Sequence, residues 1–467
     1  MKKRSLLILA VIGLSSLGLV GCNNGEQSKD GKIAIKYLIS NESTAYKTIL
    51  DDVISEFNAS IEDEGYYIDA SVPGGSYYES LGRLMAANNT PDIFMMEYGY
   101  FYSYQNKMAD LTKYLDESEG LSSSDLWDLN DYYKDNNGKL KAIIKDFSPD
   151  FMLIYNKTML DSYNKSVSEE DRFYLSETEP VTWEYFYKMV SALQRKGYAE
   201  YGTSLGFEGT KHLHEIVQST GVNMYTNDEK GINATNNNLR EAFAFFYALQ
   251  KDDITQGDTD SASELQVYNE VQKLNIGKKA PASYTSGSTT TEQELFKSGR
   301  CFSIFNGLYS FPSYDFYNVN FEYGIAPHPV QNEGDKPFGT TSAMVSHAIS
   351  ASSRHKDIAW RFIEYYQTEG LKKLSKIAFN IPGNKTIAGS DAFLVQENEK
   401  VQKMVNYFYD FVSKGYCVPT EYNSLVDYSV INTCFSTVQS KYFSQSNPYT
   451  FYEMIDQVNL LIKQQAI

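Results

Sequence analysis

The sequence predicts an α/β protein with two lobes. The chain has 467 residues, which is more than one hydrophobic core usually supports, so at least two folding units are expected. After residue 31, runs of β-forming residues alternate with segments of helical spacing, an order typical of a parallel sheet covered by helices. Hydrophobic residues make up 42% of the chain and charged residues 22%. This composition indicates globular domains rather than a disordered or multi-span membrane protein.

The alternation of strands and helices is regular at the start of the chain. Residues 32–39 alternate as a strand, residues 45–61 have helical spacing, and a strand (67–72), a helix (76–88) and a strand (92–96) follow. Parallel sheets bind ligands beyond the carboxyl ends of their strands. The loops after the first and third strands are therefore candidate binding segments. Their candidate ligand-binding residues are Asn41, Glu42, Glu97, Tyr98 and Tyr100.

The N-terminus predicts export and a lipid anchor. A basic start, Met1-Lys2-Lys3-Arg4, precedes an apolar run over 5–20 that is too short and too rich in Gly and Ser for a comfortable membrane span. The run ends in Leu19-Val20-Gly21-Cys22, which matches the lipobox of bacterial lipoproteins. A plain secretory signal with an incidental cysteine is the alternative. We expect a signal peptide over 1–21, a lipid on Cys22, a flexible tether over 22–31, and a protein held at the outer face of the bacterial cytoplasmic membrane.

Charge, aromatic content and cysteines narrow the function further. The formal net charge of −17 argues against a nucleic-acid partner, whose phosphates need a basic surface. The 38 tyrosines suit surfaces that bind amphipathic ligands, although a compositional habit of the source organism explains most of them. Apart from Cys22, the cysteines are Cys301, Cys417 and Cys434. A disulfide between Cys417 and Cys434 could form in an oxidising compartment, but buried free thiols in two neighbouring helical segments are the favoured state.

A strand-loop-strand stretch over 296–330 is the predicted meeting point of the two lobes and the ligand. A short β-rich run ends at the turn pair Asn306-Gly307, which is followed by the aromatic residue Tyr309. A second strand over 320–326 is ended by Pro327 and Pro329, because proline cannot donate a ladder hydrogen bond. We expect Asn306 and Tyr309 to face the ligand.

Two acidic residues lie in the segment 145–157, which the family resemblance described below implies is a hinge between the lobes. A carboxylate of Asp146 or Asp150 can accept two charge-assisted hydrogen bonds from ligand hydroxyls. The alternative for each residue is a capping or turn role, which is common for Asp.

Several of these segments resemble one known family. The pattern Phe296-x-x-Gly-Arg300, a short strand, Asn306-Gly-x-aromatic, and then Tyr323-Gly-Ile-Ala-Pro-x-Pro329 is similar to the sugar-binding subunits of bacterial ABC importers, the maltose-binding-protein-like extracellular solute-binding proteins. Tyr155-Asn-Lys157 and Thr182-Trp-x-x-Phe186 fit the same family. The resemblance runs in order from about residue 33 to residue 385.

The resemblance implies a fold. It is the two-lobed periplasmic-binding-protein-like type II fold, with a hinge and an inter-lobe ligand cleft. It implies an N-terminal lobe over 32–147 plus 323–372 and a C-terminal lobe over 151–320 plus 378–467.

The resemblance also implies a function. This is a lipid-anchored substrate-binding subunit of a carbohydrate importer, which captures an oligosaccharide and delivers it to the membrane subunits, as a monomer without a cofactor. In the family, the aromatic residue at the position of Tyr309 stacks on a sugar ring, usually as tryptophan, and the loop that contains Asn380 approaches the groove. A receptor for a non-sugar solute and a surface glycoside hydrolase with two carboxylates are the alternatives.

Two further motifs carry less weight. Gly202-Thr-Ser-Leu-Gly206 fits the nucleophile-elbow pattern, but an elbow needs a strand before the serine and a helix after it, and here the predicted order is the reverse. The histidines of Lys211-His-Leu-His-Glu215 would point apart on a helix, so we expect no metal site. Lys211 follows a predicted strand and is kept as a candidate ligand-binding residue.

Overall fold

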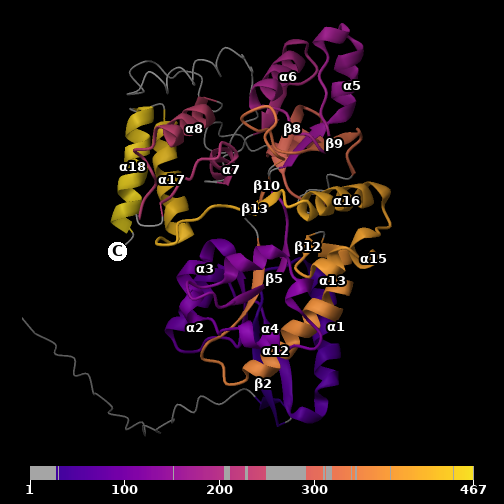
Figure 1. Ribbon diagram of the computed structural model, residues 1–467, viewed down its shortest axis with the longest axis vertical. Coiled ribbons are helices and arrows are strands. Elements are labelled where there is room, and N and C mark those ends of the chain that lie inside the picture. The colour runs from indigo at the N-terminus through magenta and orange to yellow at the C-terminus, as the bar shows by residue number, and fades with distance from the viewer. Residues whose placement is uncertain are drawn as a thin grey trace, which may run out of the picture.

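The computed structural model consists of two bodies joined at a narrow waist (Figure 1). The predicted two-lobed α/β fold is confirmed, with a separate sheet in each body. A first hydrophobic core fills the first lobe and extends onto one side of the second sheet, including Ile154 and Ile304, and a second core lies within the second lobe. The described residues are 28–29, 31–150, 152–204, 211–226, 230–248, 291–308, 311, 318–337, 339–341, 344–378, 380–444, 446 and 448–465.

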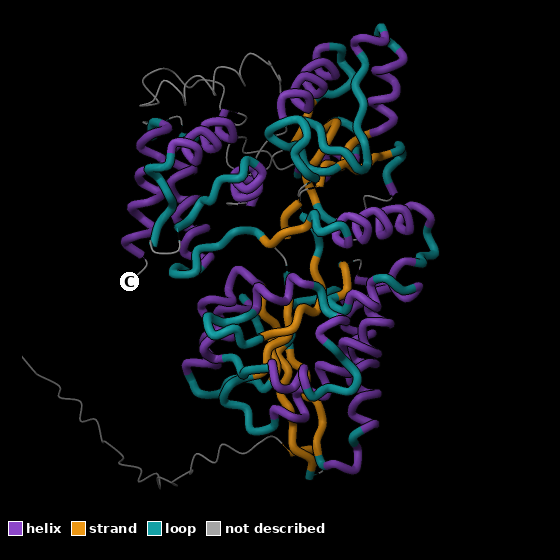
Figure 2. The backbone as a smooth tube through the Cα atoms, viewed as in Figure 1, coloured by secondary structure: helices purple, strands orange, loops and turns teal. Residues whose placement is uncertain are grey.

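The first lobe is built on a seven-stranded mixed sheet, whose strands run through the centre of the lower body (Figure 2). The strand order is β1-β2-β4-β11-β5-β12, and β3 pairs with β2. β2 is parallel to β3 and β4, as predicted, whereas β11 is antiparallel to β4 and β5. The strands are β1 (Ser28–Lys29), β2 (Lys32–Leu38), β3 (Tyr66–Ser71), β4 (Ile93–Glu97), β5 (Ala142–Phe147), β11 (Val345–Ile349) and β12 (Ile381–Pro382).

Helices cover this first sheet. Ser43 caps the first of them by accepting a hydrogen bond from the Tyr46 amide, and the apolar residues at helical spacing, such as Leu50 and Phe57, are buried. One predicted loop is wrong: the residues after Glu97 form a helix. The helices are α1 (Thr44–Ser60), α2 (Tyr77–Ala86), α3 (Tyr98–Tyr104), α4 (Thr112–Asp116), α12 (Lys356–Tyr365), α13 (Leu371–Ala378), α14 (Lys385–Ala388) and α15 (Asp391–Leu394), with short 3₁₀ turns, among them one over Asp128–Tyr133.

The second lobe has a four-stranded sheet and two groups of helices. The strand order is β7-β8-β6-β9, and β6 is antiparallel to both of its neighbours. Helices α17 and α18 pack together on the left of Figure 1, near α8. The elements are β6 (Met152–Asn156), α5 (Lys157–Lys165), α6 (Trp183–Arg195), β7 (Tyr201–Ser204), α7 (Lys211–Ser219), α8 (Asn237–Ala248), α10 (Glu292–Lys297), β8 (Cys301–Asn306), β9 (Tyr323–Ala326), α17 (Tyr428–Tyr442) and α18 (Phe451–Gln465). Helix α16 (Glu399–Ser413) follows α15, and its buried residues belong to the first core.

The waist contains the segments that pass from one lobe to the other. The first lies between β5 and β6, where the Asp150 amide donates to the Thr340 carbonyl at 2.6 Å. A short parallel pair, β10 (Gly339–Thr341) and β13 (Cys417–Pro419), lies beside it. Cys417 is therefore in a strand, not in a helix as predicted, and Cys301, Cys417 and Cys434 are free, buried thiols.

Two predicted lobe boundaries are wrong. Residues 323–372 were assigned to the N-terminal lobe, but β9 pairs with β6 in the second sheet. Gly324 makes this pairing possible, because a Cβ there would lie 2.3 Å from the Tyr155 ring. Residues from 378 were assigned to the C-terminal lobe, but β12 pairs with β5 in the first sheet, and α14 and α15 pack on the first core.

Among the described residues, no helix is long and apolar enough to cross a membrane.

Candidate functional site

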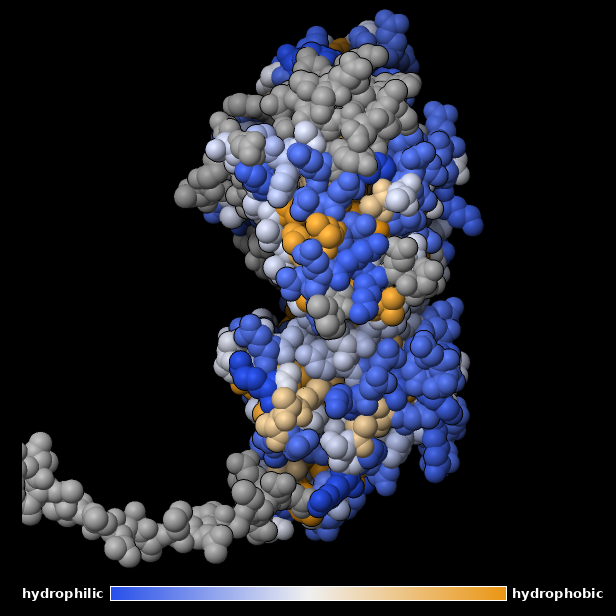
Figure 3. Space-filling model, turned by 90° about the vertical axis from the view of Figure 1, so that its left-hand side faces the viewer, coloured by the Kyte–Doolittle hydropathy of each residue, from blue (hydrophilic) through white to orange (hydrophobic). Residues whose placement is uncertain are grey.

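Residues of both lobes meet across the waist on the side where α17 and α18 lie. Figure 3 views this side and shows that the surface is indented between the two bodies. The first lobe contributes the start of α3, directly after the carboxyl end of β4. The second lobe contributes residues 420–428, between β13 and α17. We call this region the cleft.

Tyrosine rings from the two lobes contact each other in the cleft. The Tyr98 ring centroid lies 5.7 Å from that of Tyr422, with an angle of 64° between the planes. Tyr100 and Tyr428 meet edge to face at 6.3 Å. Gly99 allows this approach, because a Cβ there would lie 3.2 Å from the Tyr422 ring. Two of the predicted residues, Tyr98 and Tyr100, therefore lie at the lobe interface.

A polar contact joins the same two elements. Ser103 Oγ, on α3, donates to Asp427 Oδ2 at 2.7 Å. The other oxygen of Asp427 caps α17 by accepting from the Ser429 amide at 2.8 Å. Asp427 thus couples the position of α3 to the first turn of α17.

Tyr98 and Tyr100 are neutral phenols at physiological pH. Burial, with a further contribution from the Glu97 carboxylate, raises the pKa of Tyr100 to about 12. Burial, helped by the nearby Tyr102, also raises the pKa of Tyr98. A neutral phenol can both donate and accept a hydrogen bond, and its ring has an apolar face.

The second-lobe wall of the cleft is held by hydrogen bonds behind the tyrosines. Glu421 accepts from the amides of Met224 and Tyr225, at 2.9 and 3.3 Å. The Tyr225 hydroxyl lies 2.7 Å from Nε2 of His214, which is buried on α7. These contacts fix the backbone that presents Tyr422.

An ionic network lies at the carboxyl ends of β2 and β5. Lys145 Nζ lies 2.9 Å from Asp146 Oδ2 and 3.2 Å from Glu42 Oε1. Asn380 donates to Asp146 Oδ1 at 3.2 Å. The positive charge of Lys145 makes the largest contribution to the lowered pKa of Glu42. Burial lowers the pKa of Lys145, but Asp146 and Glu42 outweigh it, so the pKa lies well above the usual lysine value.

A buried carboxyl group lies near the hinge. Glu215, on α7, is only 1% exposed, and its Oε1 is 3.6 Å from His328 Nε2. Burial, followed by the charge of Asp150, raises the pKa of Glu215 well above the usual carboxyl value. Asp150 is also 1% exposed. It lies in the segment that connects the lobes.

Comparison with known proteins identifies the family. The family model for the bacterial extracellular solute-binding proteins matches residues 50–373. The chain belongs to this family. The described residues of the cleft, the hinge and both sheets therefore form part of a solute-binding protein.

Relatives of this solute-binding protein are distant in sequence and similar in fold. The multiple sugar-binding protein of Streptococcus mutans is 22% identical over 382 residues, which cover 77% of this chain and 78% of that protein. The substrate-binding protein Lmo0181 of Listeria monocytogenes, solved with cycloalternan, has a TM-score of 0.65 at 18% identity over 93% of this chain and 99% of its own. The sugar-binding protein MalE of Xanthomonas citri has a TM-score of 0.68 at 15% identity, over 92% and 98% of the two chains.

The remaining predicted residues of the solute-binding protein are distributed over several places. Asn306 is buried at the end of β8, where its Oδ1 accepts from the Gly307 amide. Asn41 is exposed and accepts from Lys47 Nζ at 3.2 Å. Lys211 is the first residue of α7, and its side chain lies outside the described structure. Tyr309 and Cys22 also lie outside the described residues.

The sequence did not single out Tyr422, Tyr428 or Glu421. Their signal is weak: a short β run, Cys417–Pro419, followed by tyrosines at 422 and 428 before a helix. Glu215 was noticed only as part of a rejected metal motif. Nothing local to these residues indicates that they lie beside β4 or the hinge.

Proposed function

We propose that this protein is the lipid-anchored substrate-binding subunit of a carbohydrate importer, which captures an oligosaccharide between its lobes as a monomer and delivers it to the permease. The observation that carries the proposal is the pair of tyrosine contacts across the cleft, Tyr98 with Tyr422 and Tyr100 with Tyr428. Rings contributed by both lobes suit a ligand that has several flat C–H faces.

The chemistry of the cleft fits a polyol. Neutral tyrosine hydroxyls donate and accept, and carboxylates such as Glu97 and Glu42 accept charge-assisted hydrogen bonds from sugar hydroxyls. Glu42 keeps 24% of its side chain exposed beside the ionic network. We assign ligand contacts to Glu42, Glu97, Tyr98 and Tyr100, and Tyr309 and Lys211 remain predictions.

Closure follows from contacts with both lobes. A ligand that touches α3 and residues 420–428 gains its contacts only when the lobes approach, so it favours the closed state by its differential affinity. The closed state is the one we expect the importer to recognise.

The relatives support a carbohydrate over other solutes. The Streptococcus mutans relative is named for sugar binding. Two structural neighbours, the cycloalternan complex and the cyclic α-maltosyl-1,6-maltose binding protein of Arthrobacter globiformis, bind cyclic oligosaccharides. An oligosaccharide rather than a single sugar also suits a cleft with several rings.

A thermal-shift panel tests the ligand class. We expect at least one oligosaccharide to raise the unfolding temperature in a concentration-dependent way, because a ligand that binds only the folded state stabilises it by mass action. Peptides and other non-sugar solutes form the comparison arm. A rise with peptides alone, or no rise with any saccharide, would overturn the proposal. The appearance of new reducing ends after incubation of the protein with an oligosaccharide would indicate a hydrolase instead.

The lipid anchor is tested separately. In bacteria expressing the full chain with a radiolabelled fatty acid, we expect label on the protein and its loss in Cys22→Ala. Cys434→Ala is the matched control, because Cys434 is buried in α17. Label that persists in Cys22→Ala would contradict the anchor without affecting the cleft proposal.

A further inference from the structure

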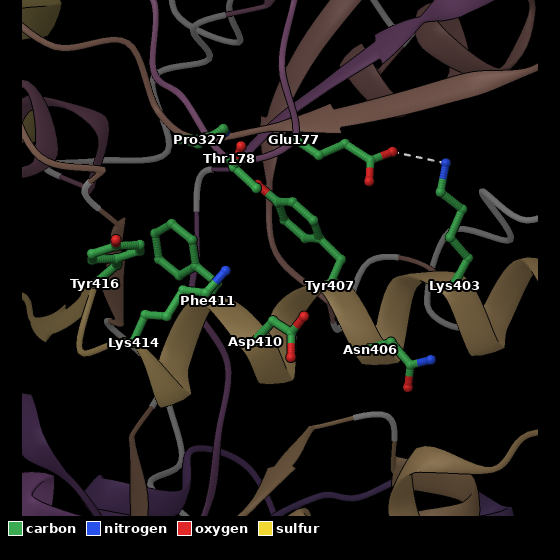
Figure 4. Close-up of a pocket in the computed structure, with 10 residues that line it drawn as sticks. All are labelled: Glu177, Thr178, Pro327, Lys403, Asn406, Tyr407, Asp410, Phe411, Lys414 and Tyr416. Atoms are coloured by element: carbon green, nitrogen blue, oxygen red, sulfur yellow. Dashed lines mark ion pairs between the residues drawn. The ribbon is translucent and has the colours of Figure 1, made fainter.

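A second cavity lies away from the cleft, between α16 and the second lobe (Figure 4). Its volume is about 250 Å³. One wall is a face of α16 and the residues just after it, and the opposite wall contains Glu177, Thr178 and Pro327. None of the residues that line it belongs to the tyrosine pairs of the cleft. In Figure 1, α16 lies on the right, opposite α17 and α18.

The charges that line this cavity balance. Lys403 Nζ lies 2.8 Å from Glu177 Oε1, and this ion pair bridges the two walls (Figure 4). Asp410 and Lys414 also line the cavity, and neither forms an ion pair with another residue in the described part of the chain. Two carboxylates and two ammonium groups give no net charge. The cavity therefore offers strong donors and acceptors without favouring an anion or a cation.

The same cavity has an aromatic side. Tyr407, Phe411 and Tyr416 line it. The Tyr407 and Phe411 rings are 24° from parallel at 6.4 Å, and Phe411 meets Tyr416 edge to face at 5.6 Å. The Tyr407 hydroxyl is sealed from solvent and has no hydrogen-bond partner in the described structure. A buried phenol without a partner is unfavourable, so a shift of the ring that brings this hydroxyl to a bound polyol would be favoured.

We propose that this cavity is a second binding site, which takes an uncharged polyol about the size of one sugar ring. Aromatic faces suit the C–H face of such a ring, and the charged and amide groups suit its hydroxyls. A cavity volume of about 250 Å³ suits a ligand of about the size of one sugar ring. The site is separate from the proposed function of the cleft.

Ligand-detected NMR tests this site. Saturation-transfer difference spectra of the full chain would be recorded with D-glucose and with myo-inositol, and with citrate and L-arginine as charged comparisons. We expect signals from a polyol and much weaker signals from the charged compounds. In Thr178→Trp, a large side chain would fill the cavity from an exposed loop position, and we expect the polyol signal to fall at least fivefold. Thr178→Ser is the matched control and keeps the signal.

A second variant separates this cavity from the cleft. Gly99→Trp places a bulky side chain against Tyr422 and blocks the cleft. We expect the polyol signal to survive in Gly99→Trp and to fall at least fivefold in Thr178→Trp, with thermal unfolding confirming that both variants are folded. Loss in Gly99→Trp, persistence in Thr178→Trp, or no signal in the unmodified chain would each overturn the proposal.

Two conservative variants test the named contacts. Tyr407→Phe removes the hydroxyl group that has no partner in the described structure and keeps the ring. Asp410→Asn replaces a carboxylate that forms no ion pair with another described residue. We expect each to weaken polyol binding about tenfold while the unfolding temperature stays unchanged. Glu399→Gln, on the same helix but outside the cavity, is the control and should bind like the unmodified chain. Unchanged binding in both Tyr407→Phe and Asp410→Asn would contradict the assignment.

Discussion

Ser103 Oγ donates to Asp427 Oδ2 at 2.7 Å, and this hydrogen bond links α3 of the first lobe to the first turn of α17 in the second. The two residues are 324 positions apart in the chain. Their contact shows that the cleft is bounded by groups that bond directly to each other when the lobes are together.

Removal of this hydrogen bond should favour the open state. Ser103→Ala deletes the donor, and a net loss of ~1–2 kcal/mol for a bond to a charged acceptor corresponds to a shift of about five- to thirtyfold toward the open form. We expect a larger radius of gyration in X-ray scattering of the ligand-free protein. Ser429→Ala is the matched control, because Ser429 Oγ also bonds to Asp427 but within the second lobe. An unchanged radius in Ser103→Ala would show that other contacts decide closure.

The ring of Tyr428, rather than its hydroxyl, should carry ligand affinity. Under the proposed function, Tyr428→Ala should weaken oligosaccharide binding about tenfold to a hundredfold because it removes a stacking face, whereas Tyr428→Phe should cost far less. Calorimetric titration with the saccharide found in the thermal-shift panel measures both. Equal losses in the two variants would assign the affinity to the hydroxyl group instead.

Lys145 should be essential for the stability of the first lobe. Its side chain is 3% exposed between Asp146 and Glu42, so Lys145→Met leaves Asp146 buried without its partner. We expect a loss of roughly 3–5 kcal/mol in the free energy of unfolding, measured by urea denaturation. The double variant Lys145→Met/Asp146→Asn should recover part of the loss. Lys47→Met, which removes only an exposed hydrogen bond to Asn41, is the control, and a similar loss there would contradict this account.

Glu215 should make stability depend on pH in a defined direction. Burial and Asp150 raise its pKa in the folded state, so the folded protein favours the protonated form. The cost of keeping an ionised Glu215 buried is absent below the pKa of Glu in the unfolded chain, about 4.3. This cost grows as the pH rises toward the pKa of Glu215 in the folded protein. We expect Glu215→Gln to raise the urea midpoint at pH 7 and to match the unmodified chain near pH 4. Glu399→Gln should match it at both pH values. A Glu215→Gln variant that is less stable at pH 7 would show that the carboxylate is the favoured form.

Much of the first lobe could be predicted because its signals are local. The strand expected over 32–39 is β2, Lys32–Leu38, and the helix expected over 45–61 is α1, Thr44–Ser60. Apolar residues recur every 2 residues along a strand and every 3.6 residues along a helix, so each of these elements can be recognised from its own residues alone. The same logic placed Tyr98 and Tyr100 at a strand end, and the structure brings both to the lobe interface.

The sequence by itself determined the α/β class, the two-lobe organisation and the family. Only the tertiary structure decided that β9 joins the second sheet, that β12 completes the first, and that Tyr422 lies against Tyr98. The physical reason is that strand pairing and ring contacts join residues far apart in the chain. A short strand such as Tyr323–Ala326 has the same local pattern in either sheet. Its partner is chosen by steric fit, such as that of Gly324 against the Tyr155 ring.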